Sequence, residues 1–207
     1  HCDRVDRYSE LLARLHGGFD EQWIFNLKVG SILHDIGKIG VRGAILSKPA
    51  KLDEDERLEM STHPEIGGRI VRTLYGMNLE PMVRHHHERY DGKGYPDGLE
   101  GEAIPLEARI ILIADTFDAM TSDRPYRKAR SAEVALRILN ESVGTQLDPD
   151  AVKAFVRIQA RDPSLAMLSR YLVLTPFPQG FREPGFPLPP TAHHLRLLTI
   201  DAARSEA

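Results

Sequence analysis

The chain has 207 residues, of which 42% are hydrophobic, and this is enough for one large domain with a real core. Its net charge is −3 with both signs interspersed, so the basic field that holds a phosphate backbone is missing and we expect no duplex nucleic-acid partner. The single cysteine, Cys2, excludes an internal disulfide, and the longest apolar stretches, such as IILIA, are far shorter than the ~20 residues that cross a bilayer. A reducing cytoplasm therefore fits best. The sequence starts at His1 without an initiator methionine or secretory signal, so we expect a piece of a longer polypeptide.

Apolar residues recur at helical spacing along most of the chain, and alternating strand patterns are scarce. The apolar positions of the first predicted helices are Val5, Tyr8, Leu11, Leu12 and Leu15, then Ile24, Leu27, Ile32 and Leu33, and then Ile66, Ile70 and Leu74. Three helix starts carry capping signals, namely Asp53 with Glu56, Thr62 with Glu65, and Asp148 followed by Pro149. The sequence therefore predicts an all-α helical bundle.

The composition changes near the end of the chain. Six prolines crowd the segment that follows Tyr171, and such a segment cannot form a continuous helix. We therefore predict one domain over residues 1–170 and a proline-rich, extended C-terminal tail over residues 171–207.

The second predicted helix runs into a polar pair, His34 and Asp35, in SILHDIGKIG. Neighbouring helical residues point about 100° apart, so both side chains reach one site only if that site is larger than a single atom. Two metal ions roughly 3.5 to 4 Å apart meet this condition, because a carboxylate can bridge them while the imidazole binds one. Asp35 is our candidate for the bridging ligand.

Four further candidate ligands follow, namely His63 at the start of a helix, the adjacent pair His86 and His87, and Asp115 in the apolar helix RIILIADTFDAM. An ionised carboxylate in such apolar surroundings is costly unless a cation offsets its desolvation, so Asp115 is expected to face a metal. Asp118, three residues later on the same face, is a candidate to orient a ligand. Any one of these histidines alone is more often structural, but six nitrogen and oxygen donors without a thiolate favour two divalent ions, iron or manganese first, over a closed zinc site.

Five motifs are specific when read together: HDIGKIG at 34–40, KP at 48–49, HPEIG at 63–67, HHExxDGxGYP at 86–96 and ADxxDAMTSxRPYR at 114–127. With the opening HCDRV, they resemble the HD-GYP family, a branch of the HD-domain phosphohydrolases, over residues 1 to about 160. The resemblance implies an HD-type helical bundle. It also implies a bacterial signalling enzyme, a phosphodiesterase that opens the ring of cyclic di-GMP to give linear pGpG, GMP or both.

The same resemblance assigns the two-metal site to the six positions reached above: His34, Asp35, His63, His86, His87 and Asp115. Some members of the family bind a third metal through the histidine that matches His1 and an acidic residue just upstream of it, a position that precedes the first residue here. The resemblance further implies that GGDEF-domain proteins dock on the GYP loop, residues 91–98 with Gly94, Tyr95 and Pro96, and that a sensory or receiver domain precedes the domain.

The expected mechanism is attack on a phosphodiester by a hydroxide held between the two cations. Lys38, one turn beyond Asp35, is expected to act electrostatically on the bound phosphate; the alternative is a solvated lysine at a helix end. Arg124 and Arg127 are candidates to grip the other phosphate, since guanidinium groups bind phosphate in a forked geometry, or else they are charges at the rim.

The segment HHHERYDGKGYPDG places a glycine-rich loop beside the histidine pair. Gly94 lets the backbone approach a flat ligand closely and Tyr95 offers a ring, so both are predicted to bind substrate; an ordinary turn whose tyrosine caps the core is the alternative. His85 receives no role.

Two other functions stay open. The first is a regulatory module that binds diguanylate cyclases without turnover, although none of the six ligands is missing. The second is an enzyme for another cyclic dinucleotide or for a nucleotide monophosphate, because a two-metal centre attacks whichever phosphate ester is placed in line.

Overall fold

The computed structural model describes residues 1–123 and 128–161. Arg124, Arg127, the predicted domain boundary at residues 170 and 171, and the proline-rich tail lie outside these residues. The helices are α1 Cys2–His16, α2 Glu21–Leu33, η1 Ile36–Gly40, α3 Gly43–Leu46, α4 Glu54–Met60, α5 His63–Val71, α6 Glu80–His85, η2 Gly101–Ala103, α7 Leu106–Thr121, α8 Ala132–Glu141 and α9 Pro149–Arg161, where η denotes a 3-10 helix. Only two isolated β-bridges interrupt this pattern in the described part of the chain, so the all-α prediction is confirmed.

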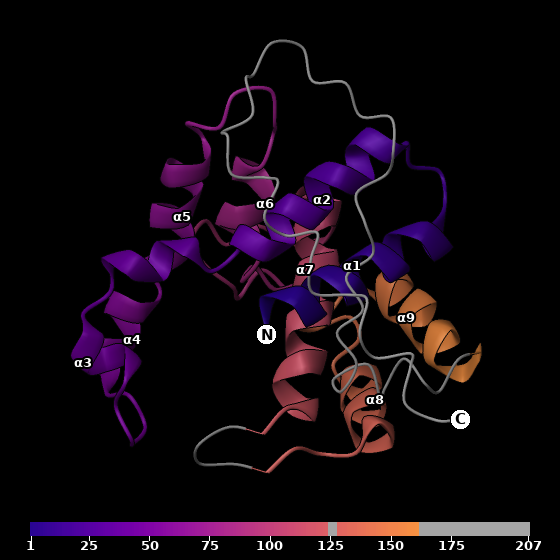
Figure 1. Ribbon diagram of the computed structural model, residues 1–207. Coiled ribbons are helices and arrows are strands. Elements are labelled where there is room, and N and C mark those ends of the chain that lie inside the picture. The colour runs from indigo at the N-terminus through magenta and orange to yellow at the C-terminus, as the bar shows by residue number, and fades with distance from the viewer. Residues whose placement is uncertain (124–127, 162–207) are drawn as a thin grey trace, which may run out of the picture. The chain divides into compact units, whose positions relative to one another are not determined.

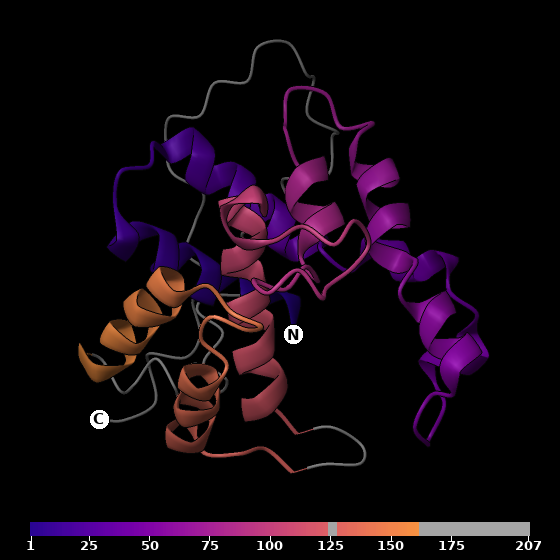
Figure 2. The same ribbon diagram turned by 180° about the vertical axis from the view of Figure 1, so that it is seen from behind.

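The core is built around α7, which passes through the middle of the helices in both views (Figures 1 and 2). Its apolar residues face neighbours on several sides and are almost all buried, as expected for a helix that is apolar around its whole circumference. Phe117 of α7 meets Tyr8 of α1 and Phe155 of α9 edge to face, with ring centroids 5.2 and 5.0 Å apart. No helix among the described residues is both long and apolar enough to cross a membrane.

Two of the three predicted caps are present. Asp53 accepts from the backbone N–H of Glu56 at 3.0 Å, and Glu56 accepts in return from the backbone N–H of Asp53 at 2.9 Å, which is the predicted capping box of α4. Asp148 accepts from the first free N–H groups of α9, just after Pro149. The prediction for Thr62 is wrong: its backbone is already helical and its hydroxyl donates to a carbonyl three residues earlier, so it caps nothing.

Candidate metal centre

The candidate ligands lie mostly where helices begin or end. They are His34 and Asp35 in the turn between α2 and η1, His63 at the first position of α5, His86 and His87 just after α6, and Asp115 inside α7. A helix end holds its side chain in a fixed position while the backbone changes direction. The turn after α2, the start of α5 and the turn after α6 can therefore direct their side chains to one point.

Gly37 makes this convergence possible. A Cβ atom at this position would lie 1.9 Å from the carbonyl oxygen of His63 and 2.5 Å from the backbone nitrogen of Gly67, so only glycine allows η1 to lie directly on the start of α5. The contact brings the carboxylate of Asp35 to the imidazole of His63, with Oδ1 and Nε2 3.2 Å apart.

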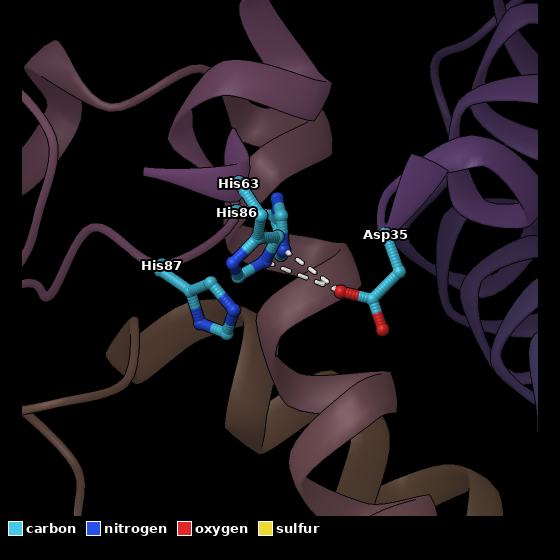
Figure 3. Close-up of side chains that lie close together, drawn as sticks. All are labelled: Asp35, His63, His86 and His87. Atoms are coloured by element: carbon cyan, nitrogen blue, oxygen red, sulfur yellow. Dashed lines mark ion pairs between the residues drawn. The ribbon is translucent and has the colours of Figure 1, made fainter. Parts of the chain in front are cut away.

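Four side chains form one compact group. Asp35, His63, His86 and His87 each offer a ligand atom, and these atoms lie within 4.8 Å of one another. Figure 3 shows the three imidazoles gathered opposite the carboxylate, whose Oδ1 also lies 3.9 Å from Nε2 of His86.

Asp35 belongs to a second group as well, with His1 and His34. Its other oxygen, Oδ2, lies 3.4 Å from Nε2 of His34 and 4.0 Å from Nε2 of His1. One carboxylate oxygen thus faces each group, which is the arrangement that a carboxylate bridging two ions requires.

Backbone carbonyls fix the orientation of three of these rings. The Nδ1 atoms of His34, His63 and His86 lie 2.6 to 2.7 Å from carbonyl oxygens three residues earlier in the chain. When Nδ1 donates to a carbonyl, Nε2 carries a lone pair, and in all three residues this buried Nε2 atom has no hydrogen-bond partner. Lone pairs that face carboxylate oxygens at 3.2 to 3.9 Å repel one another unless a cation lies between them, so the residues fit a metal.

The protonation states also suit a metal. Burial, with the neighbouring His87 and His34, lowers the pKa of His86 well below its ordinary value. Burial and the nearby His63 lower the pKa of His87 to about 3. Burial opposes the ionisation of Asp35, but neighbouring groups, among them the ammonium group of Lys38 at 2.5 Å, outweigh burial and lower its pKa. Neutral imidazoles and an ionised carboxylate are the forms that bind metal ions.

Asp115 lies outside the compact group of four. Its side chain is 21% exposed, and its Oδ1 lies 3.4 Å from Nε2 of His1. The other ring nitrogen of His1 lies 2.7 Å from Oδ2 of Asp118, and this hydrogen bond raises the pKa of His1. Asp118 therefore holds the ring of His1 beside Asp115 and Asp35.

Sequence reasoning missed the partner of Asp118. The guanidinium of Arg4 pairs with both carboxylate oxygens and donates to Ser122 Oγ at 2.9 Å. Arg4 is the arginine of the opening HCDRV, so the motif itself was the available signal.

Lys38 is at the site. Its Nζ lies 2.5 Å from Oδ2 of Asp35, and its side chain is partly exposed.

The GYP loop lies against His87. The rings of Tyr95 and His87 stack with centroids 5.0 Å apart, and burial raises the pKa of Tyr95 to about 12. A Cβ atom on Gly94 would lie 2.3 Å from the backbone nitrogen of Arg89, so this glycine brings the loop against the chain that follows the histidine pair.

Two other residues fix this loop. Glu88, which was not predicted, is buried, and its Oε1 accepts from the backbone N–H groups of Asp97 at 2.7 Å and Gly98 at 3.0 Å. His85, which received no role, lies 2.9 Å from the carboxylate of Asp97 through Nε2 and outside the metal-binding groups. His85 therefore helps to hold the GYP loop in place.

Comparisons with known proteins show which family and which relatives the chain resembles. A family model described as HD domain matches residues 2–151. The chain is 44% identical over 162 residues to the cyclic di-GMP phosphodiesterase response regulator RpfG of Xanthomonas campestris, an alignment that covers 77% of this chain and 43% of that protein. It is 43% identical over 155 residues to 3'3'-cGAMP-specific phosphodiesterase 3 of Vibrio cholerae, covering 74% of this chain and 34% of that protein. The chain thus spans less than half the length of either relative.

Solved structures share the fold. The cyclic GMP-AMP specific phosphodiesterase V-cGAP3 of Vibrio cholerae superposes with a TM-score of 0.63 at 19% identity, over 83% of this chain and 46% of that one. Bd1817, an HDG"Y"P protein of Bdellovibrio bacteriovorus, gives a TM-score of 0.61 at 19% identity, over 77% of this chain and 51% of that one. Because the HD-domain model covers well over half of the sequence, and because the motifs between His34 and Arg127 are those of the HD-GYP branch, the chain belongs to the HD-GYP branch of the HD-domain family.

Proposed function

We propose that the chain is a metal-dependent phosphodiesterase that hydrolyses cyclic di-GMP to linear pGpG, GMP or both. The observation that carries the proposal is the carboxylate of Asp35, which faces buried, unpartnered imidazole nitrogens with both of its oxygens. The relatives support the substrate class, because one is named for cyclic di-GMP and another for 3'3'-cGAMP, which keeps 3'3'-cGAMP as a second candidate substrate.

Two divalent ions, iron or manganese, would be held by the six ligands of the sequence: Asp35 with His63, His86 and His87, and Asp35 with His34 and Asp115. When bound, the ions supply Lewis acidity at the phosphate and activate the attacking water at neutral pH. His1 is the candidate ligand for a third ion, and Asp118 fixes its ring.

The remaining residues bind and orient the substrate. Lys38 neutralises charge on the phosphate as the phosphorus is attacked, and its contact with Asp35 keeps the ammonium there. Gly94 and Tyr95 form a wall for the nucleotide. Arg124 and Arg127 are proposed to hold the second phosphate.

The test is hydrolysis by the purified chain, prepared with and without oxygen, with elemental analysis and chromatography of the products from cyclic di-GMP. We expect release of pGpG or GMP that stops after chelation and returns with Mn²⁺ or Fe²⁺. Hydrolysis that persists after complete chelation would contradict the metal assignment. The absence of turnover with every metal, on cyclic di-GMP and on 3'3'-cGAMP, would contradict the proposed function.

A further inference from the structure

An open groove of about 470 Å³ lies between α4 and the GYP loop, lined by Glu54, Arg57, Leu58, Ser61 and Tyr95. The groove adjoins the candidate metal centre, because Tyr95 stacks on His87 and Ser61 is two residues before His63. Figure 1 shows α4 beside α3 and away from the core helices α7, α8 and α9.

Two charged side chains of this groove are free. Within residues 1–123 and 128–161, neither Arg57 nor Glu54 makes a side-chain hydrogen bond or an ion pair, whereas Glu59, near the C-terminal end of α4, pairs with Arg42. A guanidinium group and a carboxylate that are not used within the fold are available to a ligand.

Two other lining residues of the groove offer apolar surface. Leu58 is 62% exposed, an unusual position for a large aliphatic side chain, and Tyr95 carries an aromatic ring. A planar base fits such a pair of surfaces, since every nucleobase has a face that stacks on an aromatic ring.

We propose that this groove binds one guanine base of the cyclic dinucleotide and that Arg57 and Glu54 select guanine over adenine. The inference rests on the proposed function and adds a specificity determinant to it. Arginine donates two parallel hydrogen bonds to O6 and N7 of guanine, whereas adenine presents an amino donor in place of O6. The N1–H and C2 amino groups of guanine donate to a carboxylate, whereas adenine has an acceptor at N1 and no amino group at C2.

The spacing of Glu54 and Arg57 on α4 allows each side chain to contact a different edge of one base. Residues three apart on a helix are neighbours on its surface, roughly 5 to 6 Å apart at Cβ, so Glu54 and Arg57 lie along one side of the groove. The two base edges that they would read are adjacent and meet at O6, so both side chains can contact the same base.

The test compares kcat/KM for cyclic di-GMP, 3'3'-cGAMP and cyclic di-AMP in the wild type and in Arg57→Met, Arg57→Lys and Glu54→Gln. The matched controls are Arg137→Met and Glu133→Gln on α8, where Glu133 lies in the first helical turn as Glu54 does in α4. We expect Arg57→Met to lower the preference for cyclic di-GMP over cyclic di-AMP by roughly 10-fold, the size of one bidentate contact to guanine. Arg57→Lys should also lower it, because a lysine lacks the fork, and Glu54→Gln should lower it less.

The possible outcomes distinguish the guanine site from the proposed phosphodiesterase function. An active wild type whose substrate preference is unchanged in Arg57→Met overturns the guanine site and leaves the phosphodiesterase intact. An equal loss on all three substrates that Arg57→Lys restores also overturns it, because Arg57 would then act only as a charge. A wild type that hydrolyses none of the three substrates overturns the proposed function itself.

Discussion

Nε2 of His63 lies 3.2 Å from Oδ1 of Asp35, while Nδ1 of the same ring lies 2.7 Å from the carbonyl oxygen of Met60. If the proton of the neutral ring is on Nδ1, two lone pairs face each other across this distance. The same relationship holds between His34 and the other oxygen of Asp35. Ligand lone pairs in this arrangement repel one another and a cation between them relieves the repulsion, so metal binding should stabilise the fold.

Replacement of Asp35 by alanine is expected to remove the metal and to abolish hydrolysis, because both groups of ligands share this carboxylate. Mn²⁺ at 100 times its dissociation constant should stabilise the wild type by about 2.7 kcal/mol, and Asp35→Ala should lose this gain. Elemental analysis, urea unfolding with and without Mn²⁺, and circular dichroism check the prediction. Asp150→Ala, an exposed carboxylate in the first turn of α9, is the control. Retained turnover in Asp35→Ala would refute the bridging role.

Replacement of Lys38 by methionine should lower kcat by roughly 10²-fold, the loss that follows removal of one group that stabilises transition-state charge. Metal content should stay at the wild-type level, since an ammonium group binds no metal. The readouts are kcat and elemental analysis, with the exposed Lys153→Met on α9 as the control. A parallel loss of metal would show instead that Lys38 serves to position Asp35.

Gly37→Ala tests the contact that assembles the site. The added methyl group would lie 1.9 Å from a backbone oxygen that cannot move without shifting His63, so we expect a loss of stability of at least about 2 kcal/mol and weaker metal binding. Gly43→Ala is the matched control, since a Cβ atom there meets nothing within 4 Å. Urea unfolding and metal titration measure both effects. Wild-type metal affinity in Gly37→Ala would mean that η1 and α5 need not touch.

The sequence predicts the helical fold and the positions of the candidate ligands because both depend on local patterns. Apolar periodicity marks the helices, and the ligands stand at helix ends whose motifs are short and specific. The compact group of Asp35, His63, His86 and His87 lies where those motifs indicated.

What the sequence does not predict depends on residues that only the fold brings together. Arg4 and Asp118 are 114 positions apart, and no spacing rule relates them. The failed cap at Thr62 has a different cause, since a capping pattern cannot reveal that the preceding backbone is already helical. Ile32 is exposed although it follows the helical period, because α2 is apolar on several sides and the period does not say which side is buried.

Glu88→Ala is expected to loosen the GYP loop. It leaves the backbone N–H groups of Asp97 and Gly98 without their acceptor, at a cost of about 2 kcal/mol. Amide hydrogen exchange at these two residues should accelerate, and the KM for cyclic di-GMP should rise because Tyr95 lies in the same loop. The exposed Glu102→Ala is the control. Unchanged exchange at Asp97 and Gly98 would contradict the anchoring role.

Asp6, which is not a candidate metal ligand, makes the free energy of unfolding depend on pH. It lies on α1, half-buried, with Ser31 Oγ 3.4 Å from its carboxylate. Burial, reinforced by Glu10, raises its pKa from 3.8 to about 6 against the opposing effect of Lys28. Between pH 3.8 and 6 the folded state therefore holds a proton that the unfolded state releases, so the free energy of unfolding falls as pH rises through this window and is lowest above it.

Asp6→Asn removes the titration. At pH 7.5 the variant should be more stable than the wild type by about 1 kcal/mol, a value reduced for the part of the carboxylate that stays in water, and the gain should vanish near pH 4. Urea unfolding at pH 4, 5, 6 and 7.5 measures it, with Asp3→Asn as the control at an exposed position of the same helix. A gain that is equal at every pH would mean that the amide stabilises through a new hydrogen bond. A loss at pH 7.5 would mean that the attraction between Asp6 and Lys28 outweighs the cost of burying the charge.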